Sequence, residues 1–342
     1  MQDLEVAPPV LQADGFRKMS LLRGGRRLLF AAASLFCLLP GPAGAGNVAT
    51  PAPIVMGTAT SGGGFEVYGR ALAEAVAEND PGLVILPRAT AGSLQNVPLL
   101  RSGTLDIALV QGTAVEEALA DGQKGKNPLS ILYALYSSPG LFAVRADQPY
   151  RTIDDLRGQA IAFGAAGSGL VGLARDVLGG LGWDMRRDFD ARLLERAGDG
   201  ADLVLNGEVT ALWGAGVGWP AFQAVAAGPA GARFIGLDDE DIARVTARYP
   251  YLKEMSVPAG AYPGMTEAVK TVGPWSFIMV RPGFPEDLAY RLARALHLAE
   301  ARLAARLPQG AETTAVNTVS TAEVGVLHPG AIRYFRDVGL LP

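Results

Sequence analysis

Turns rich in glycine and hydroxyl side chains hold the groups that could bind a ligand. The first turn, 57–64, contains Ser61, Gly62 and Gly63 and lies between a short apolar run and apolar residues at helical spacing. Glycines leave backbone N–H groups uncovered. The N-terminus of a helix attracts anions through such N–H groups and through its dipole. The turn therefore predicts contacts to a carboxylate, with a helix cap that binds nothing as the alternative interpretation.

Two further strand ends carry the same kind of residue. Thr90 and Ser93 follow the apolar run 82–86, and Gln111 ends the run 106–110. In open α/β sheets, ligands bind outside the carboxyl ends of the strands. We therefore expect these three side chains to form hydrogen bonds to a ligand, although polar residues at such positions also serve as caps.

The turn 164–169 repeats the pattern of strand, glycine and serine turn, and helix, and it contains Gly167 and Ser168. These two residues are predicted to contact the same ligand, again with a helix cap as the alternative. Tyr136 and Trp213 are candidates for stacking on the ligand. Buried aromatic residues more often belong to the core.

The elements that position these residues follow in β-α-β-α-β order from residue 54 onward, which favours an α/β fold with parallel strands covered by helices. A second α/β unit starts near residue 160. Pro98 cannot lie deep in a helix, so we expect a helix that begins near Asn96 and has Pro98 in its first turn.

Composition limits the possible functions. The 342 residues carry a formal net charge of −4 and include two histidines and one cysteine. A basic nucleic-acid surface, a Cys/His zinc site and a disulfide within the chain are therefore not expected. Ser168 lacks the complete G-x-S-x-G motif of a hydrolase. We expect no catalytic residues, no metal and no cofactor, and we keep a hydrolase only as a remote alternative.

The first 45 residues are predicted to be an N-terminal overhang followed by a signal peptide. Arginines precede the apolar run 28–39, and Ala43-Gly44-Ala45 offers a cleavage site. The run is shorter than the roughly 20 residues that a membrane-spanning helix needs. Export to the periplasm with cleavage near Ala45 is the prediction, and an uncleaved anchor is the alternative.

The sequence resembles the TAXI family of TRAP-transporter solute receptors over nearly all of the predicted mature chain. Matching blocks lie in order along the chain: 57–68, 90–96, 106–111, 155–169, 249–251, 257–264 and 327–335. The order of these blocks, more than any one of them, carries the resemblance.

The resemblance implies a type II periplasmic-binding-protein fold with a ligand cleft between two lobes. One lobe would comprise 46–145 plus 274–342, and the other 146–273. It further implies a monomer that captures a small organic anion, such as a glutamate-like amino acid, a dicarboxylate or a 2-oxo acid, for the membrane permease of a TRAP transporter. A binding component of an ABC importer or of a sensor kinase has the same fold and remains the alternative.

Overall fold

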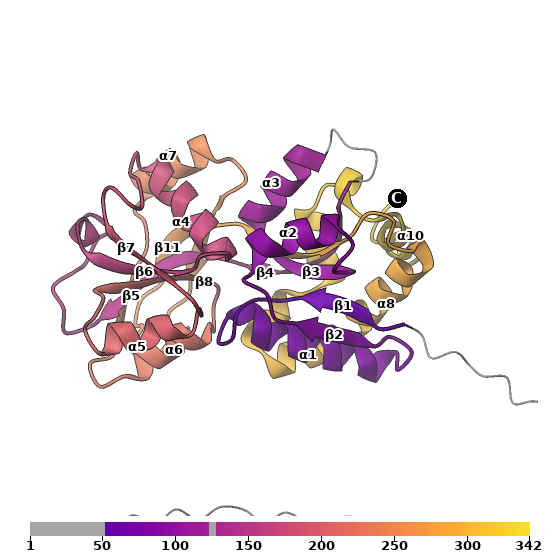
Figure 1. The fold of residues 1–342 in the computed structure, drawn as a ribbon, viewed down its shortest axis with the longest axis horizontal. Coiled ribbons are helices and arrows are strands. Elements are labelled where there is room, and N and C mark those ends of the chain that lie inside the picture. Colours follow the sequence, from indigo (N-terminus) through magenta and orange to yellow (C-terminus); the bar gives the residue numbers. More distant parts are fainter. Residues whose placement is uncertain (1–51, 123–127) are drawn as a thin grey trace, which may run out of the picture. The chain divides into compact units, whose positions relative to one another are not determined.

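The computed structural model describes residues 52–122 and 128–342, which belong to one compact unit. They form two five-stranded sheets and a two-stranded ribbon, with helices on both sides of each large sheet (Figure 1). The α/β class predicted from the sequence is confirmed. The predicted signal peptide in residues 1–45 lies outside the described residues.

The first sheet has the strand order β2-β1-β3-β12-β4. β1 pairs in parallel with β2 and β3, whereas β12 runs antiparallel to β3 and β4. All residues of β3 are buried, as expected for a strand covered on both faces. The strands are β1 (Ile54–Gly57), β2 (Ile85–Arg88), β3 (Ile107–Gln111), β4 (Ser130–Ser137) and β12 (Trp275–Val280).

Helices cover this sheet on both sides, with α2 and α3 on one side and α1 on the other (Figure 1). Tyr68, Leu72 and Val76 are buried on one face of α1, as their helical spacing predicts. We call the first sheet and its helices lobe 1. The helices are α1 (Gly64–Asn79), α2 (Ser93–Arg101), α3 (Gly112–Gly122), α8 (Glu286–Arg306), α9 (Ala315–Thr321) and α10 (Pro329–Asp337), with short 3-10 helices η2 (Pro308–Glu312) and η3 (Val324–Val326).

The predicted start of α2 near Asn96 is wrong. The helix begins at Ser93, directly after Gly92, whose φ of 115° turns the chain at the helix start. Pro98 therefore lies inside the helix and not in its first turn. Pro98 has no N–H to donate, so the helix gives up the hydrogen bond that this residue would have made to the preceding turn.

The second sheet has the order β7-β6-β8-β5-β9, in which β6 runs parallel to β7 and β8 while β5 runs antiparallel to β8 and β9. Helices α4 and α7 cover one side and α5 and α6 the other (Figure 1). We call this sheet and its helices lobe 2. Its strands are β5 (Gly140–Arg145), β6 (Ala160–Ala165), β7 (Asp190–Leu194), β8 (Ala211–Ala215) and β9 (Ala232–Ile235).

The helices of lobe 2 are α4 (Gly169–Gly180), α5 (Asp199–Leu205), α6 (Pro220–Ala227) and α7 (Asp239–Arg248), with a 3-10 helix η1 (Asp154–Leu156). The ribbon consists of β10 (Lys253–Val257) and β11 (Val269–Gly273). Because β5 lies in the second sheet, the lobe boundary placed at residue 145 falls one strand later than the change of sheet. The apolar run of β5 does not reveal which sheet it joins.

The chain crosses from lobe 1 to lobe 2 between β4 and β5 and returns between β11 and β12. The two crossings touch, because the Ser138 N–H donates to the Pro274 carbonyl at 2.9 Å. The Ser138 and Ser276 hydroxyls also share a hydrogen bond of 2.9 Å. Two adjacent crossing segments form a hinge about which the lobes can rotate. In the described part of the chain, no helix is long and apolar enough to cross a membrane.

Candidate functional site

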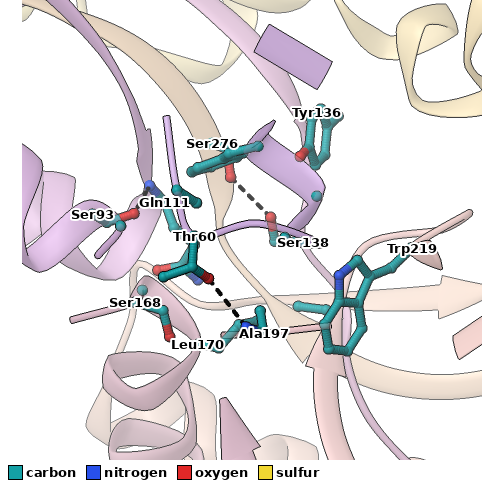
Figure 2. A pocket seen from close by; sticks show the side chains of 17 residues that line it. Thr60, Ser93, Gln111, Tyr136, Ser138, Ser168, Leu170, Ala197, Trp219 and Ser276 are labelled. Carbon is teal, nitrogen blue, oxygen red and sulfur yellow. Dashed lines mark hydrogen bonds between the residues drawn. The ribbon is translucent and has the colours of Figure 1, made fainter. Parts of the chain in front are cut away.

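A cavity of about 70 Å³ lies where the two lobes meet beside the hinge (Figure 2). That volume holds a few water molecules or a short organic ligand. Lobe 1 lines it with Ala59, Thr60, Gly63, Gly64, Phe65, Gly92, Ser93, Gln111, Tyr136, Ser138 and Ser276. Lobe 2 lines it with Ser168, Gly169, Leu170, Ala197, Ala215 and Trp219.

Helix N-termini from both lobes point their first turns at this cavity. The residues that precede α1, α2 and α4 are Gly63, Gly92 and Ser168, and no side chain caps any of these three helices. All three residues line the cavity. The first N–H groups of a helix have no partner within the helix, so the cavity receives backbone donors and the positive ends of helix dipoles from both lobes.

Gln111 is the last residue of β3, and in the part of the chain that the structure describes only the oxygen of its side-chain amide has a hydrogen-bond partner. Its backbone N–H donates to the Ser93 hydroxyl oxygen at 3.0 Å, and its Oε1 accepts from the Thr113 N–H at 3.0 Å. The Gln111 Nε2 amide has no hydrogen-bond partner among the described residues, although the residue is only 4% exposed. The amide therefore presents donors to the cavity.

Ser168 presents a second unpartnered group from the opposite lobe. Ser168 is 9% exposed, and within the described chain its Oγ has no hydrogen-bond partner. The close approach of the two lobes here needs glycine. A Cβ on Gly169 would lie 2.5 Å from the Gln111 Cβ, closer than carbon atoms can pack.

Aromatic rings form the remaining wall of the cavity. The rings of Phe65 and Tyr136 lie 6.1 Å apart in an edge-to-face arrangement. Burial raises the pKa of Tyr136 well above its usual value, so its hydroxyl stays neutral. Trp219 completes the wall from lobe 2 and packs its outer side on Phe222 with ring centroids 4.9 Å apart.

The lining contains no Asp, Glu, Lys, Arg or His among the described residues. Its hydrogen-bonding groups are hydroxyls, one side-chain amide and backbone N–H groups, most of which can donate. Such a site can bind the oxygen atoms of a ligand and enclose a small apolar part. Elsewhere in the described chain, no group of three or more His, Cys, Asp or Glu side chains could hold a metal ion.

The structure brings together half of the residues that the sequence singles out as ligand contacts. Those that line the cavity are Gly63, Ser93, Gln111, Tyr136 and Ser168. Ser93 uses its oxygen as an acceptor for Gln111, which leaves its O–H available as a donor.

The other five predicted contacts do not line the cavity. Ser61 is exposed. Gly62 lies against Gly198, and Gly167 lies against Ala91, so both glycines pack one lobe against the other. The Thr90 hydroxyl donates to the Thr58 carbonyl at 3.1 Å. Trp213 is in the core of lobe 2, where its Nε1–H donates to the Leu170 carbonyl at 3.0 Å.

Sequence reasoning did not select several lining residues, chiefly Ser138, Ser276 and Trp219. Ser138 and Ser276 lie at the two crossings, where strands change sheets, and no local pattern marks such positions. Trp219 belongs to the same glycine-rich stretch as Trp213. Pro220, which starts α6, is the signal that places Trp219 rather than Trp213 at a helix start.

A larger hollow of about 580 Å³ lies elsewhere, between α3, β12 and residues 320–326. Its walls include Val115, Leu119, Trp275 and Phe277. None of the unpartnered buried side-chain atoms found in the described residues belongs to its lining. The small cavity between the lobes is therefore the stronger candidate for a ligand site.

Several solved structures are similar to this chain at low sequence identity. A structure from Bordetella bronchiseptica RB50 is similar with a TM-score of 0.50 and 15% identity, over 85% of this chain and 82% of that chain. The alkanesulfonate-binding protein SsuA from Xanthomonas axonopodis pv. citri bound to MOPS has a TM-score of 0.46 and 18% identity, over 85% and 95% of the chains. The substrate binding protein of an amino acid ABC transporter has a TM-score of 0.44 and 14% identity, over 76% and 97%.

At 15% identity, the likeness to the Bordetella structure concerns the fold alone, and the TAXI assignment stays a prediction. One family model matches residues 56–339. This range includes both lobes and every residue that lines the cavity. The chain belongs to the NMT1-like family.

Proposed function

We propose that this chain is an exported solute-binding protein that captures a small organic anion between its lobes and delivers it to a membrane transporter. One observation carries the proposal. Gln111 Nε2 from lobe 1 and Ser168 Oγ from lobe 2 are buried, lack partners in the described structure and line one cavity.

Unpartnered buried polar groups need a reason in a folded protein. Leaving one unsatisfied costs about 1–3 kcal/mol, and native structures contain few. A ligand that accepts hydrogen bonds from both groups removes this cost only when the lobes are together. Binding and closure of the lobes are then coupled.

The contacts between the lobes support capture by closure. The Leu94 N–H at the start of α2 donates to the Gly167 carbonyl at 3.0 Å, and the Ala197 N–H donates to the Thr60 hydroxyl at 3.1 Å. Both bonds lie at the rim of the cavity and join lobe 1 to lobe 2. They can break by rotation about the hinge without disturbing either core, because each partner belongs to a turn or a helix end.

The two histidines do not support the hydrolase alternative. His297 Nδ1 lies 2.8 Å from the Tyr334 hydroxyl, and His328 bonds the Phe284 carbonyl and the Gly330 N–H. Neither lines the cavity with Ser168. Activation of a serine needs a base within hydrogen-bond reach, so we propose binding without catalysis.

The transporter class is a separate proposal from the binding role. The TRAP assignment rests on the resemblance to TAXI receptors. Among the similar structures described above, the transporter named is an ABC transporter. A binding component of an ABC importer is therefore the working proposal, with the TRAP receptor and the sensor-kinase component as alternatives. Pull-down from detergent-solubilised membranes of the source cells, with identification of the captured membrane protein, distinguishes the three.

Thermal unfolding with a panel of organic acids and amino acids tests the binding role. A ligand at about 100 times its dissociation constant stabilises the folded protein by about 2.7 kcal/mol. The purified protein is first unfolded and refolded to remove any retained ligand. We expect stabilisation by at least one acid, and in Ser168→Ala a stabilisation of only about 1.4 kcal/mol, as a tenfold loss of affinity implies.

Ser102→Ala is the matched control, because Ser102 is exposed and lies outside the cavity lining. It should retain the full stabilisation. Full stabilisation in Ser168→Ala, or a stabilisation that falls equally in both variants, would contradict the proposed site.

A further inference from the structure

We propose that the ligand is a short monocarboxylate without an ammonium group, such as a 2-oxo acid or 2-hydroxy acid with a small apolar tail. This inference rests on the proposed function and narrows its ligand class. It selects one of the chemistries that the sequence left open and rejects both the amino acid and the dicarboxylate.

The donors in the cavity determine which end of the ligand is recognised. Gln111 Nε2 offers two N–H groups, and Ser168 and Ser93 each offer a hydroxyl. The uncapped starts of α1 and α4 add backbone N–H groups, and α2 adds the positive end of its dipole, since its Leu94 N–H is bonded to the Gly167 carbonyl. Both lobes therefore supply donors to the cavity, as suits one carboxylate with an adjacent carbonyl or hydroxyl oxygen.

Among the described residues, the same lining contains no carboxylate side chain to pair with an ammonium group. Two carboxylates near the lining already have partners: Glu66, next to Phe65, pairs with Arg70, and Glu312 accepts from the N–H of Ser137, next to Tyr136, at 2.7 Å. Neither carboxylate is in the lining. An ammonium brought into the closed cavity would lose its water without gaining an anion, which is strongly unfavourable.

A second carboxylate on the ligand would also find no partner of opposite charge in the lining that the structure describes. No arginine, lysine or histidine occurs among the described lining residues. Tyr136 and Trp219 lie across the cavity from Gln111 and Ser168 (Figure 2), and Phe65 also lines it. An apolar tail fits against these rings, whereas a charged end would be desolvated there. The volume of about 70 Å³ keeps the tail short.

Matched pairs of ligands test the inference by isothermal titration calorimetry on the refolded, ligand-free protein. The pairs are pyruvate and alanine, 2-oxobutyrate and 2-aminobutyrate, and 2-oxoisovalerate and valine, with 2-oxoglutarate and glutamate as the dicarboxylate pair. Within each monocarboxylate pair we expect the oxo acid to bind about 100-fold more tightly or more. We expect neither member of the dicarboxylate pair to match the best monocarboxylate.

The outcomes separate this inference from the proposed function. Tighter binding of an amino acid, or of 2-oxoglutarate, would overturn the inference while leaving a solute-binding protein in place. Absence of binding for every acid and amino acid, together with no effect of Ser168→Ala on the unfolding temperature in their presence, would overturn both.

Gln111→Glu tests the recognising group directly. The substitution keeps an oxygen that accepts from the Thr113 N–H but replaces the two free donors by a negative charge. We expect oxo-acid affinity to fall about 100-fold and the ratio of oxo-acid to amino-acid affinity to fall by at least about tenfold.

Gln223→Glu is the control, because Gln223 lies on α6 outside the cavity lining and makes the same change of charge. Its affinity ratio should equal that of the parent protein. If Gln111→Glu does not fold, Ser168→Ala serves instead, with a loss of oxo-acid affinity of about tenfold. An unchanged affinity ratio in Gln111→Glu, or an unchanged oxo-acid affinity in Ser168→Ala, would contradict the inference.

Discussion

The hydroxyl oxygen of Thr60 accepts a hydrogen bond from the Ala197 N–H at 3.1 Å, and this bond links the β1–α1 turn of lobe 1 to the segment before α5 in lobe 2. Beside it, the backbones of Gly62 and Gly198 meet directly. The two lobes therefore touch at one end of the cavity through groups that a rotation about the hinge would separate.

Thr60→Val should weaken ligand binding by about five- to tenfold. Valine keeps the branched shape but cannot accept from Ala197, and the unpaired N–H costs about 1 kcal/mol in the closed state only. Calorimetric dissociation constants measure the effect. Thr266→Val is a fitting control, since Thr266 is exposed and lies outside the cavity lining. Equal affinities in the two variants would show that this bond does not contribute to closure.

Gly62→Ala should impair closure of the lobes, while its loss of folding stability should be no larger than that of Gly103→Ala. Gly62 has φ 75°, and a Cβ there would lie 2.8 Å from the Gly198 Cα across the lobes. Gly103 has φ 73° with nothing within 4 Å of its Cβ position, so Gly103→Ala carries the same backbone strain of about 1–2 kcal/mol without a collision.

Both glycine variants should therefore unfold at similarly lowered denaturant concentrations, whereas only Gly62→Ala should lose ligand affinity, by about tenfold or more. Small-angle scattering of the ligand-bound form should show a larger radius of gyration for Gly62→Ala than for Gly103→Ala. Identical affinities would mean that the lobes need not meet at Gly62 when the ligand binds.

The two tryptophans near the site should separate into a ligand contact and a core residue. Trp219 lines the cavity, whereas Trp213 packs on Phe142 with ring centroids 4.7 Å apart. Trp219→Phe should reduce the ligand-induced change in tryptophan fluorescence. Trp213→Phe should keep most of that change and lower the free energy of unfolding by about 1–3 kcal/mol, because the Leu170 carbonyl loses its donor. A fluorescence change lost only in Trp213→Phe would reverse these roles.

The sequence was sufficient to predict the fold class because many strands are short apolar runs, and β1, β2 and β6 are each followed by a turn with glycine and a helix. The same logic found Ser93, Gln111 and Ser168, since parallel strand ends meet at one edge of a sheet. It could not show which sheet β5 joins, because a buried run such as Leu141–Val144 fits the interior of either lobe equally well.

Glycines in these turns can serve ligand binding or packing between the lobes, and the sequence alone does not distinguish the two roles. Gly62 and Gly167 lie in ligand-like turns, yet they serve close packing of one lobe on the other. A glycine that leaves room for a ligand and a glycine that leaves room for another backbone have the same signature. Only the three-dimensional partner, Gly198 or Ala91, distinguishes them.

His328 predicts a loss of stability as the pH falls. The residue is 7% exposed, its Nδ1 accepts from the Gly330 N–H at 3.1 Å, and its Nε2 lies 3.0 Å from the Phe284 carbonyl. The neutral ring with its proton on Nε2 satisfies both contacts. Burial lowers the pKa of His328 below its usual 6.5, against opposing effects of the Phe284 carbonyl and Glu286.

Because the unfolded chain takes up the His328 proton at a higher pH than the folded protein, the stabilising effect is present above about pH 6.5 and is lost as the pH falls through the lower pKa of the folded state. Urea unfolding at about pH 7.5 and about pH 5.5 measures the change. His328→Asn, which keeps a good N-cap for α10, should lose less stability between these pH values than the parent protein. His297→Asn is the control for the second histidine. It keeps His328 and should therefore lose as much stability between these pH values as the parent protein. An equal loss in the parent and in His328→Asn would show that protonation of His328 does not destabilise the folded state.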